Sequence, residues 1–249
     1  MKSAHAYHEE ILREIEKVAA REKVPLKKDG FRYVGTTKPG YFLRAAAIRE
    51  IFSGFSKRHR DLSTAEFGKL LDSLSLGRTY DEFIAIGLLL GAYPKLRRLL
   101  DPLCMNGWLE HAQGWAEVDV ICQSSFTADE VLSDWKTWKT LLGALAESEN
   151  VHKRRASLVL LTKPLRESND PRLARMAFAN ADKLKHGKDI LVIKALSWIL
   201  RSLIKYHRAE VEAYLDANAD TLPKIAIRET RYKLVGGVKR KTSQRTSPT

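Results

Sequence analysis

The chain has 249 residues, of which 44% are hydrophobic and 29% are charged, and its formal net charge is +13. This composition is typical of a soluble globular protein, long enough to bury a substantial core in one large domain or two small ones. No apolar run reaches the roughly 18 residues of a membrane-spanning helix and the charged N-terminus does not resemble a signal peptide, so we expect a cytoplasmic protein with no membrane partner.

Helical periodicity runs through almost the whole chain. In 6–23, for example, Tyr7, Ile11 and Ile15 fall on one stripe, as the 3.6-residue period of an amphipathic helix requires. No segment alternates polar and apolar residues convincingly, as a strand would. We therefore predict an all-α protein of ten to twelve helices, near 6–23, 42–56, 63–74, 79–92, from Pro94, 127–150, 151–166, from Asp170, 189–206, 208–218 and 221–234.

Three of these predicted helices begin with a capping signature, in which a hydroxyl side chain stands shortly before a glutamate. The pairs are Ser63 or Thr64 before Glu66, Thr79 before Glu82, and Thr127 before Glu130.

Helix rhythm also suggests an architecture. Paired helices that recur at roughly 35–45 residues are typical of HEAT-like α-solenoids, and a compact, irregular helical domain is the alternative. We assign 1–235 to a single domain of this kind. The segment 236–249 has paired glycines and four basic residues, and we expect it to be a disordered basic tail.

The two cysteines indicate neither a metal site nor a redox motif. Cys104 and Cys122 do not form a C-x-x-C pair, and the seven histidines are scattered. This usage suits a reducing compartment. We expect no metal and no cofactor.

The stretch "GWLEHAQGWAEVDVICQ" (107–123) combines aromatic and acidic residues. Trp115 and Asp119 are four residues apart, so one face of a helix carries both. His111 and Cys122 on that face make it less apolar than a core stripe. The functional interpretation is a site that presents an aromatic plane and a negative charge. The alternative for Asp119 is an ordinary surface acid or a local hydrogen-bond acceptor.

The neighbouring tryptophans have a simpler interpretation. Trp108 is expected to pack at a helix start. Trp135 and Trp138 fall in line with leucines of the 127–150 helix, so we assign both to the core.

The segment "NVHKRRASLVLL" (150–161) places Lys153, Arg154 and Arg155 in the first turn of a predicted helix. Cations at this end oppose the helix dipole, so their presence favours a bound anion such as a phosphate. The alternative is that these side chains point into water.

The predicted helix 189–206 has two distinct sides. One side holds Lys194, Ser197, Trp198, Arg201 and Lys205, and the other holds Ile190, Ile193, Leu196, Leu200, Leu203 and Ile204. A tryptophan among cations can present its ring to a ligand whose phosphates the cations bind. Cation–π packing on the helix surface explains the same pattern equally well.

The basic excess is confined to one part of the chain. Residues 1–150 hold 21 basic and 21 acidic residues, whereas 151–249 hold 22 basic and 9 acidic residues. This asymmetry favours a polyanionic partner, most commonly nucleic acid, although a solvated basic surface is the alternative.

Four segments together resemble the DNA alkylation repair enzyme family, the AlkD-like DNA glycosylases built from HEAT-like repeats. They are "GWAEVDVIC", "SENVHKRRASLVLL", "IKALSWILRSLIKYHRAEVEAYL" and "IRETRYKL". The segments come in the family's order, and the likeness covers roughly 5–235. It implies a curved α-solenoid with a concave, basic DNA-binding face.

The resemblance also implies an activity and a site. It implies hydrolysis of the N-glycosidic bond of N3- or N7-alkylated purines in double-stranded DNA, by a monomer associated with the nucleoid. By motif position the catalytic residues are Trp115, Asp119, Arg155 and Trp198, with Asp119 stabilising positive charge on the sugar and positioning water. The cations Lys153, Arg154, Lys194, Arg201 and Lys205 are the expected DNA-binding residues. His152 departs from the tryptophan that related sequences often carry.

Two other functions fit the same features. Some family members bind branched or damaged DNA without catalysis, and an α-solenoid with a basic face can instead bind an acidic protein. The complete set of four site residues favours catalysis.

Overall fold

The computed structural model describes residues 4–123 and 125–236. Most of the predicted disordered tail, 237–249, lies outside the described residues. Within them the regular structure is helical and the only β-type pairings are two isolated bridges, Lys27 with Gly40 and Phe31 with Thr36. The prediction of an all-α protein is confirmed. None of the helices in 4–123 and 125–236 is long and apolar enough to cross a membrane.

The helices follow one another closely along the chain. They are α1 (Ala4–Arg21), α2 (Ala45–Arg58), α3 (Thr64–Ser75), α4 (Tyr80–Ala92), α5 (Pro94–Arg97), α6 (Cys104–Glu110), α7 (Trp115–Cys122), α8 (Ala128–Ser133), α9 (Trp135–Glu147), α10 (Val151–Thr162), α11 (Pro164–Glu167), α12 (Pro171–Leu184), α13 (Ile190–Leu203), α14 (Arg208–Ala217) and α15 (Lys224–Leu234).

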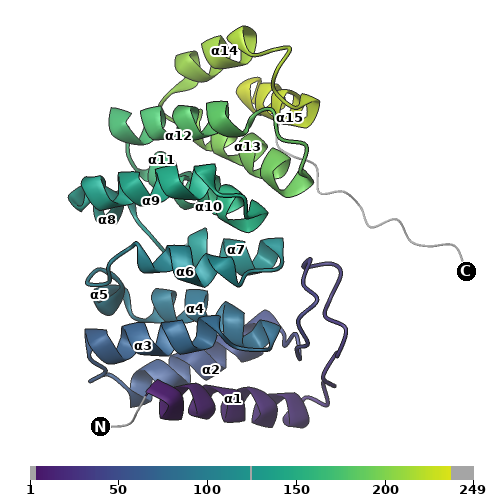
Figure 1. Cartoon of the computed structure of the whole chain (residues 1–249), viewed down its shortest axis with the longest axis vertical. Coiled ribbons are helices and arrows are strands. Elements are labelled where there is room, and N and C mark those ends of the chain that lie inside the picture. The colour runs from purple at the N-terminus through teal and green to yellow at the C-terminus, as the bar shows by residue number, and fades with distance from the viewer. Residues whose placement is uncertain (1–3, 124, 237–249) are drawn as a thin grey trace, which may run out of the picture.

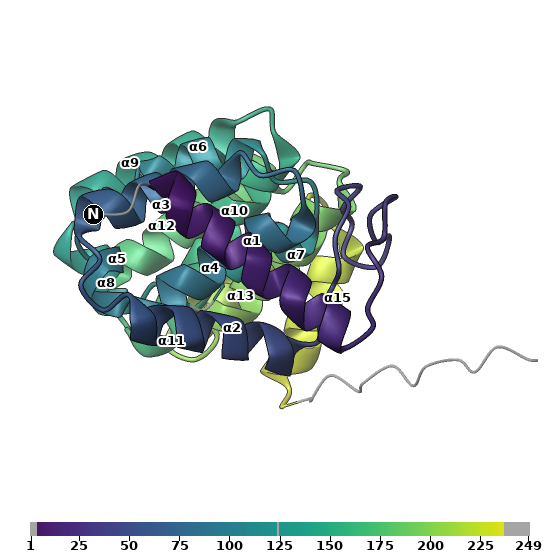
Figure 2. The same cartoon turned by 90° about the horizontal axis from the view of Figure 1, so that it is seen from below.

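The helices stack as pairs along the long axis of the molecule (Figures 1 and 2). Within pairs, α1 packs on α2, α3 on α4, α9 on α10 and α12 on α13. Between pairs, α2 contacts α4, and the series continues through α7, α10 and α13 to α15. This second series forms one continuous layer, which we call the inner layer. The result is an all-α helical-repeat fold, in which each pair buries its apolar faces against the next.

The capping signatures are confirmed, whereas the described residues form fifteen helices rather than ten to twelve, and two helix ends differ from prediction. Ser63, Thr79 and Thr127 each cap their helix through a reciprocal bond with the glutamate. The predicted helix 127–150 is divided at Asp134, whose φ of −123° and ψ of 50° leave the helical region. The predicted helix 151–166 ends early because proline at 164 has no N–H to donate and its ring crowds the preceding turn.

The buried and exposed sides of α13 differ from those predicted by sequence periodicity. Ser197, placed on the cationic side of its helix, is fully buried, whereas Ile190 on the supposed apolar side is 47% exposed. The reason is that α13 lies between α10 and α15, so more than one stripe of it is covered. The Ser197 hydroxyl donates to a carboxylate oxygen of Glu229 on α15 (2.6 Å), which satisfies it there.

Candidate active site

Helix α7 brings Trp115 and Asp119 to the edge of an open groove. Gly114 is the N-cap of the helix, Trp115 is its first residue, and Asp119 follows one turn later. The groove, of about 440 Å³, runs between α4 and α7. Its lining consists of small and apolar residues apart from the site pair: Gly87, Leu88, Gly91, Ala116, Val120, Gln123 and Ser125. The prediction that one face carries both residues agrees with this geometry.

A bidentate ion pair joins Asp119 to Arg155 of α10. Arg155 Nε donates to Asp119 Oδ1 (2.9 Å) and Nη2 to Oδ2 (2.8 Å). Arg155 Nη1 also donates to the carbonyl oxygen of Leu191 on α13 (2.7 Å), so one guanidinium links three helices of the inner layer. Burial raises the pKa of Asp119 above its usual range, and the hydrogen bond and charge of Arg155 oppose that rise.

A second buried pair of the same kind shows what is unusual about Asp119. Glu130 accepts hydrogen bonds from Nε (3.1 Å) and Nη2 (2.8 Å) of Arg97. It is as buried as Asp119, at 9% exposure. Burial raises the pKa of Glu130 too, but hydrogen bonds from Thr127 and Arg97 outweigh it and leave the pKa low. Within 4–123 and 125–236, Asp119 has no such backbone donor, and a carboxyl with a raised pKa at a groove is a candidate functional group.

The cations at the start of α10 contact protein groups. The Lys153 ammonium is buried and pairs with Glu110. Arg154 donates to the carbonyl oxygens of Ser148 (2.8 Å) and Glu149 (2.6 Å), at the end of α9. With Arg155 bound to Asp119, all three side chains are engaged inside the protein. Carboxylate and carbonyl oxygens of the protein therefore offset the unfavourable interaction of these cations with the helix dipole. The phosphate site at this turn stays a prediction.

The remaining predicted residues lie on α13 or, for Lys205, just after it, and none of them is part of the groove lining. Trp198 is half-buried against the core and does not border the α4–α7 groove. Arg201 lies 3.6 Å from Glu229, and Lys205 donates to the carbonyl oxygen of Arg166 (2.7 Å). Lys194 is exposed. Trp198 thus shares the inner layer with the site pair, and its place opposite Trp115 remains a prediction.

His152 lies one turn before Arg155 on α10. It is half-buried, and its Nδ1 atom is buried with no hydrogen-bond partner among the described residues. Burial lowers the pKa of His152, which favours the neutral ring. The departure expected from the family resemblance is therefore a polar ring whose neutral form is favoured.

The other tryptophans pack against the core, with differences from the sequence-based expectation. Trp108 is buried, in the second turn of α6 rather than at a helix start, and its Nε1 donates to Asp72 (2.7 Å). Trp138 is buried, whereas Trp135 is only half-buried, with the Arg172 guanidinium 5.9 Å from its ring. Trp135, the first residue of α9, therefore packs against the core from its edge, whereas Trp138 lies inside it.

Periodicity did not identify the loop between α1 and α2 as part of the site. The backbone carbonyl of Tyr33 accepts a hydrogen bond from Trp115 Nε1 (2.9 Å), and the two rings meet edge to face at 5.9 Å. The Tyr33 side chain is 72% exposed. The loop therefore forms a rim beside the groove. The only signal in its sequence is a tyrosine within a segment rich in glycine and threonine, "YVGTTKPGY".

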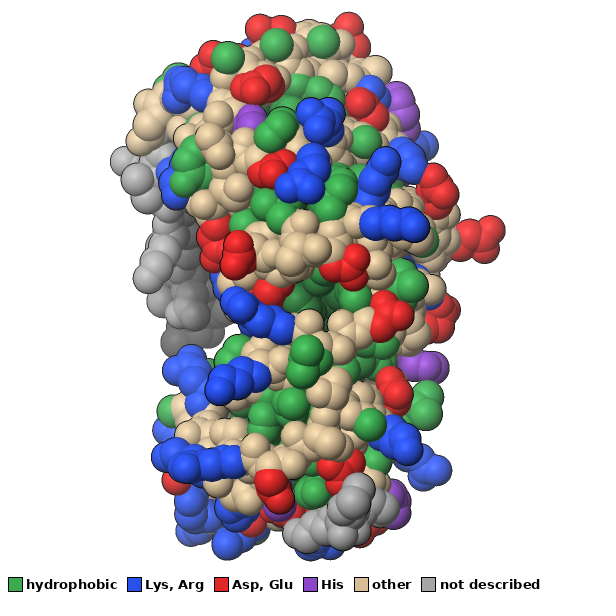
Figure 3. Space-filling model, turned by 90° about the vertical axis from the view of Figure 1, so that its left-hand side faces the viewer, with side chains coloured by type: hydrophobic (Ala, Val, Ile, Leu, Met, Phe, Trp, Pro, Cys, Tyr) green, Lys and Arg blue, Asp and Glu red, His purple; other side chains and the backbone are tan. Residues whose placement is uncertain are grey.

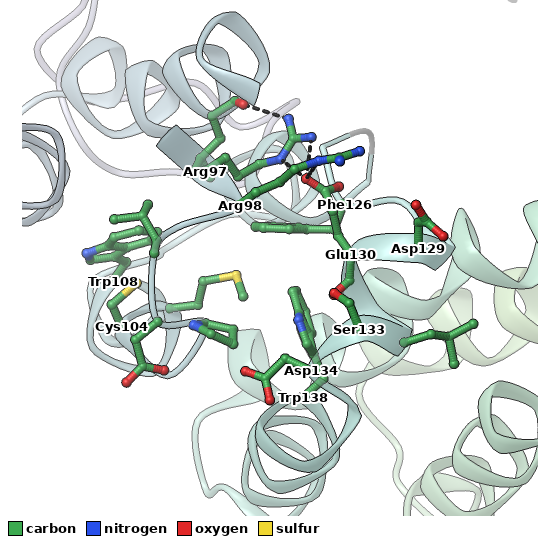
Figure 4. Close-up of a pocket in the computed structure, with 16 residues that line it drawn as sticks. Arg97, Arg98, Cys104, Trp108, Phe126, Asp129, Glu130, Ser133, Asp134 and Trp138 are labelled. Atoms are coloured by element: carbon green, nitrogen blue, oxygen red, sulfur yellow. Dashed lines mark hydrogen bonds and ion pairs between the residues drawn. The ribbon is translucent and has the colours of Figure 1, made fainter. Parts of the chain in front are cut away.

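A separate cavity of about 410 Å³ lies between α5, α6, α8 and α9 (Figure 4). Aromatic side chains line it, including Trp108, Phe126 and Trp138, and the Arg97–Glu130 pair forms part of its wall. Helices α5 and α8 lie on the left-hand side of Figure 1, the side away from the α1–α2 loop. On that face acidic and basic side chains are interspersed around an apolar hollow (Figure 3), so it is not a uniformly basic surface. None of the predicted catalytic residues borders this cavity.

The fold and this site define the class of protein as an all-α helical-repeat protein with a buried carboxylate, held by an arginine, at an aromatic-rimmed groove. The model of the family described as DNA alkylation repair enzyme matches residues 12–234. The chain belongs to that family. No individually curated protein shows significant sequence similarity to it. Membership indicates a DNA alkylation repair enzyme and suggests DNA as its partner.

Proposed function

We propose that this chain is a monofunctional DNA glycosylase that removes N3- and N7-alkylated purines from double-stranded DNA. The observation that carries the proposal is Asp119, a buried carboxylate that borders an open groove beside Trp115. Its raised pKa, in contrast to that of Glu130, indicates that the surroundings do not stabilise its charge fully. Such a group is suited to stabilising a positive charge that appears during a reaction.

The proposed reaction breaks the bond between the sugar C1′ and the base nitrogen. An alkylated purine is cationic, so the bonding electron pair neutralises the base as it leaves. Positive charge develops on the deoxyribose, and the ionised Asp119 stabilises it. A water oxygen then bonds to C1′ and gives up a proton. A preorganised group of this kind contributes roughly 10²–10³ in rate.

Arg155 holds Asp119 in the geometry that the reaction needs. Two parallel hydrogen bonds fix the carboxylate plane, and the guanidinium charge favours the ionised form. This role differs from the phosphate contact that the sequence suggested. Trp115, and Trp198 if it faces the same substrate, supply aromatic faces that favour a cationic base by about 0.5–2 kcal/mol each.

The DNA duplex is expected to lie along the inner layer, with Lys194, Arg201 and Lys205 as phosphate contacts. Binding by cations of this kind weakens steeply with added salt. The shallow groove is consistent with recognition of a lesion without a deep base pocket.

The decisive experiment identifies the bases released from methylated duplex DNA by mass spectrometry. We expect the wild-type protein to release 7-methylguanine or 3-methyladenine, and Asp119→Asn to release far less. Borohydride should trap no covalent complex, because no lysine acts as a nucleophile. Absence of release by the wild type, together with tight binding to branched DNA, would instead favour a non-catalytic DNA-structure binder.

A further inference from the structure

The loop that joins α1 to α2 docks on the N-terminal end of α7 (Figure 1). It has no regular helix or strand, and its two isolated bridges hold it as an irregular hairpin. A segment of this kind needs contacts with the rest of the fold to keep one conformation. Some of these contacts reach Gln113 and Asp81, and the two nearest the middle of the segment, from Thr36 and Lys38, meet at one buried side chain.

That side chain is Glu117 of α7, which is fully buried. Its Oε1 accepts a hydrogen bond from the hydroxyl of Thr36 (2.8 Å), and its Oε2 accepts one from the backbone N–H of Gln113 (2.6 Å). The Lys38 ammonium lies 3.5 Å from Oε2. One carboxylate therefore binds two residues of the loop and the turn that precedes α7.

Lys38 is the buried cation of this cluster, at 8% exposure. Its ammonium donates to the carbonyl oxygen of His111 (2.7 Å) and lies 4.0 Å from the centre of the Phe83 ring. Burial lowers the pKa of Lys38, and the charge of Glu117 opposes that change. Buried pairs of this type contribute little net stability compared with apolar side chains. We attribute the Lys38–Glu117 pair to its geometry, which fixes the position of the loop on α7.

Two glycines allow the backbones to approach closely. A Cβ atom added at Gly114 would lie 2.4 Å from the carbonyl oxygen of Val34 and 2.8 Å from the carbonyl carbon of Gly35. Gly35 itself has a φ of +77°, in the region that favours glycine. The loop can therefore lie against α7 only while residue 114 has no side chain.

The docked loop determines where the Trp115 indole points. Its Nε1 donates to the Tyr33 carbonyl, which the loop supplies, and the Tyr33 ring packs edge-on against it. Trp115 is half-buried and forms one wall of the groove beside Asp119. Without the loop, the indole would lose this hydrogen bond and its edge-on neighbour.

We propose that Glu117 is a positioning residue, which docks the α1–α2 loop through Thr36 and Lys38 and thereby orients the Trp115 indole in the groove. The catalytic importance of that orientation rests on the proposed function. The orientation itself does not, because it follows from contacts within the chain.

The test follows the five tryptophan indole N–H signals by NMR in protein labelled with ¹⁵N. Two variants disturb docking in different ways: Glu117→Gln removes the charge opposite Lys38, and Gly114→Ala introduces the backbone clash. Two matched controls make the same chemical changes elsewhere. Glu130→Gln alters the equally paired carboxylate of α8, and Gly143→Ala adds a methyl group where no atom lies within 4 Å. Trp115→Phe assigns the signal.

Both docking variants should speed hydrogen exchange of the Trp115 indole by at least about tenfold, since a hydrogen bond and its support are lost. In the docking variants the other four indoles should change less than twofold, and in both controls the Trp115 indole should change less than twofold. Unchanged exchange at Trp115, or a uniform change at every indole, overturns the proposal. These outcomes do not depend on glycosylase activity, so failure of the proposed function is separately visible as absent base release by the wild type.

The claim that the orientation of Trp115 serves catalysis is tested separately, by the rate of base release. If the wild type releases base, single-turnover release by Gly114→Ala should fall about ten- to a hundredfold at saturating enzyme, as misplacement of a site group predicts. Faster indole exchange with undiminished release would show that the orientation of Trp115 does not serve catalysis, and would overturn this claim.

Discussion

The pair formed by Asp119 and Arg155 should behave as a coupled unit in stability and as a single essential carboxylate in activity. Asp119→Asn leaves the buried Arg155 guanidinium without its counter-ion while its third bond, to Leu191, still holds it in place. Breaking a buried pair by removing one partner typically costs about 3–5 kcal/mol. For a chain of this size, such a loss lowers the melting temperature by about 6–20 °C.

The double variant Asp119→Asn with Arg155→Met separates the two effects. It removes both charges, and methionine fills much of the space of the arginine stem, so most of the lost stability should return. The carbonyl of Leu191 loses its donor, which costs about 1–3 kcal/mol. We would measure the free energy of unfolding in urea for the wild type, the two single variants and the double variant. The coupling energy between the two substitutions should be about 2 kcal/mol or more.

Activity should not return with stability, because the double variant still lacks the carboxylate. Base release is measured on the same four proteins at a temperature where each is folded. Additive stability changes, within about 0.5 kcal/mol, would contradict a coupled buried pair. Recovery of base release in the double variant would show that Asp119 serves only to balance Arg155.

Three further predictions concern pH, DNA binding and packing. Arg155→Met should move the acidic limb of the pH–rate profile to higher pH, because the catalytic carboxylate acts when ionised and its pKa rises without the guanidinium. Lys194→Ala should reduce the slope of log K for duplex DNA against the logarithm of the salt concentration by about 0.9. Lys136→Ala, on α9 outside the inner layer, should leave that slope unchanged in the same titration. Gly87→Ala should cost about 1–3 kcal/mol in urea denaturation, since its Cβ would lie 2.2 Å from a backbone oxygen of α7, whereas Gly91→Ala, with no atom within 4 Å, should not destabilise.

Local signals predicted most of the helices. Capping residues such as Thr79 and Thr127 determine where a helix begins through bonds made within one turn, and those bonds are visible as spacing. The four-residue spacing of Trp115 and Asp119 likewise placed both on one helix face. These features depend on neighbours along the chain, so the sequence alone was sufficient.

Contacts between distant residues could not be predicted in the same way. Arg155 was identified as a site residue, but its partner is 36 positions away, and nothing in the first turn of α10 indicated that partner. The bond between Thr36 and Glu117 spans 81 positions and joins an irregular loop to a helix. Ser197 was assigned to the wrong face because periodicity assumes one buried stripe, whereas α13 packs against α10 and α15 as well as against its pair partner α12.

The most direct test of the central claim compares two variants that remove a buried charge in the same way. Asp119→Asn and Glu130→Gln each replace a carboxylate that binds Nε and Nη2 of an arginine, and only Asp119 borders the α4–α7 groove. Single-turnover release of 7-methylguanine should fall roughly 10²–10³-fold in Asp119→Asn and less than about twofold in Glu130→Gln. Equal rates in the two variants would contradict the assignment of Asp119 as the catalytic carboxylate.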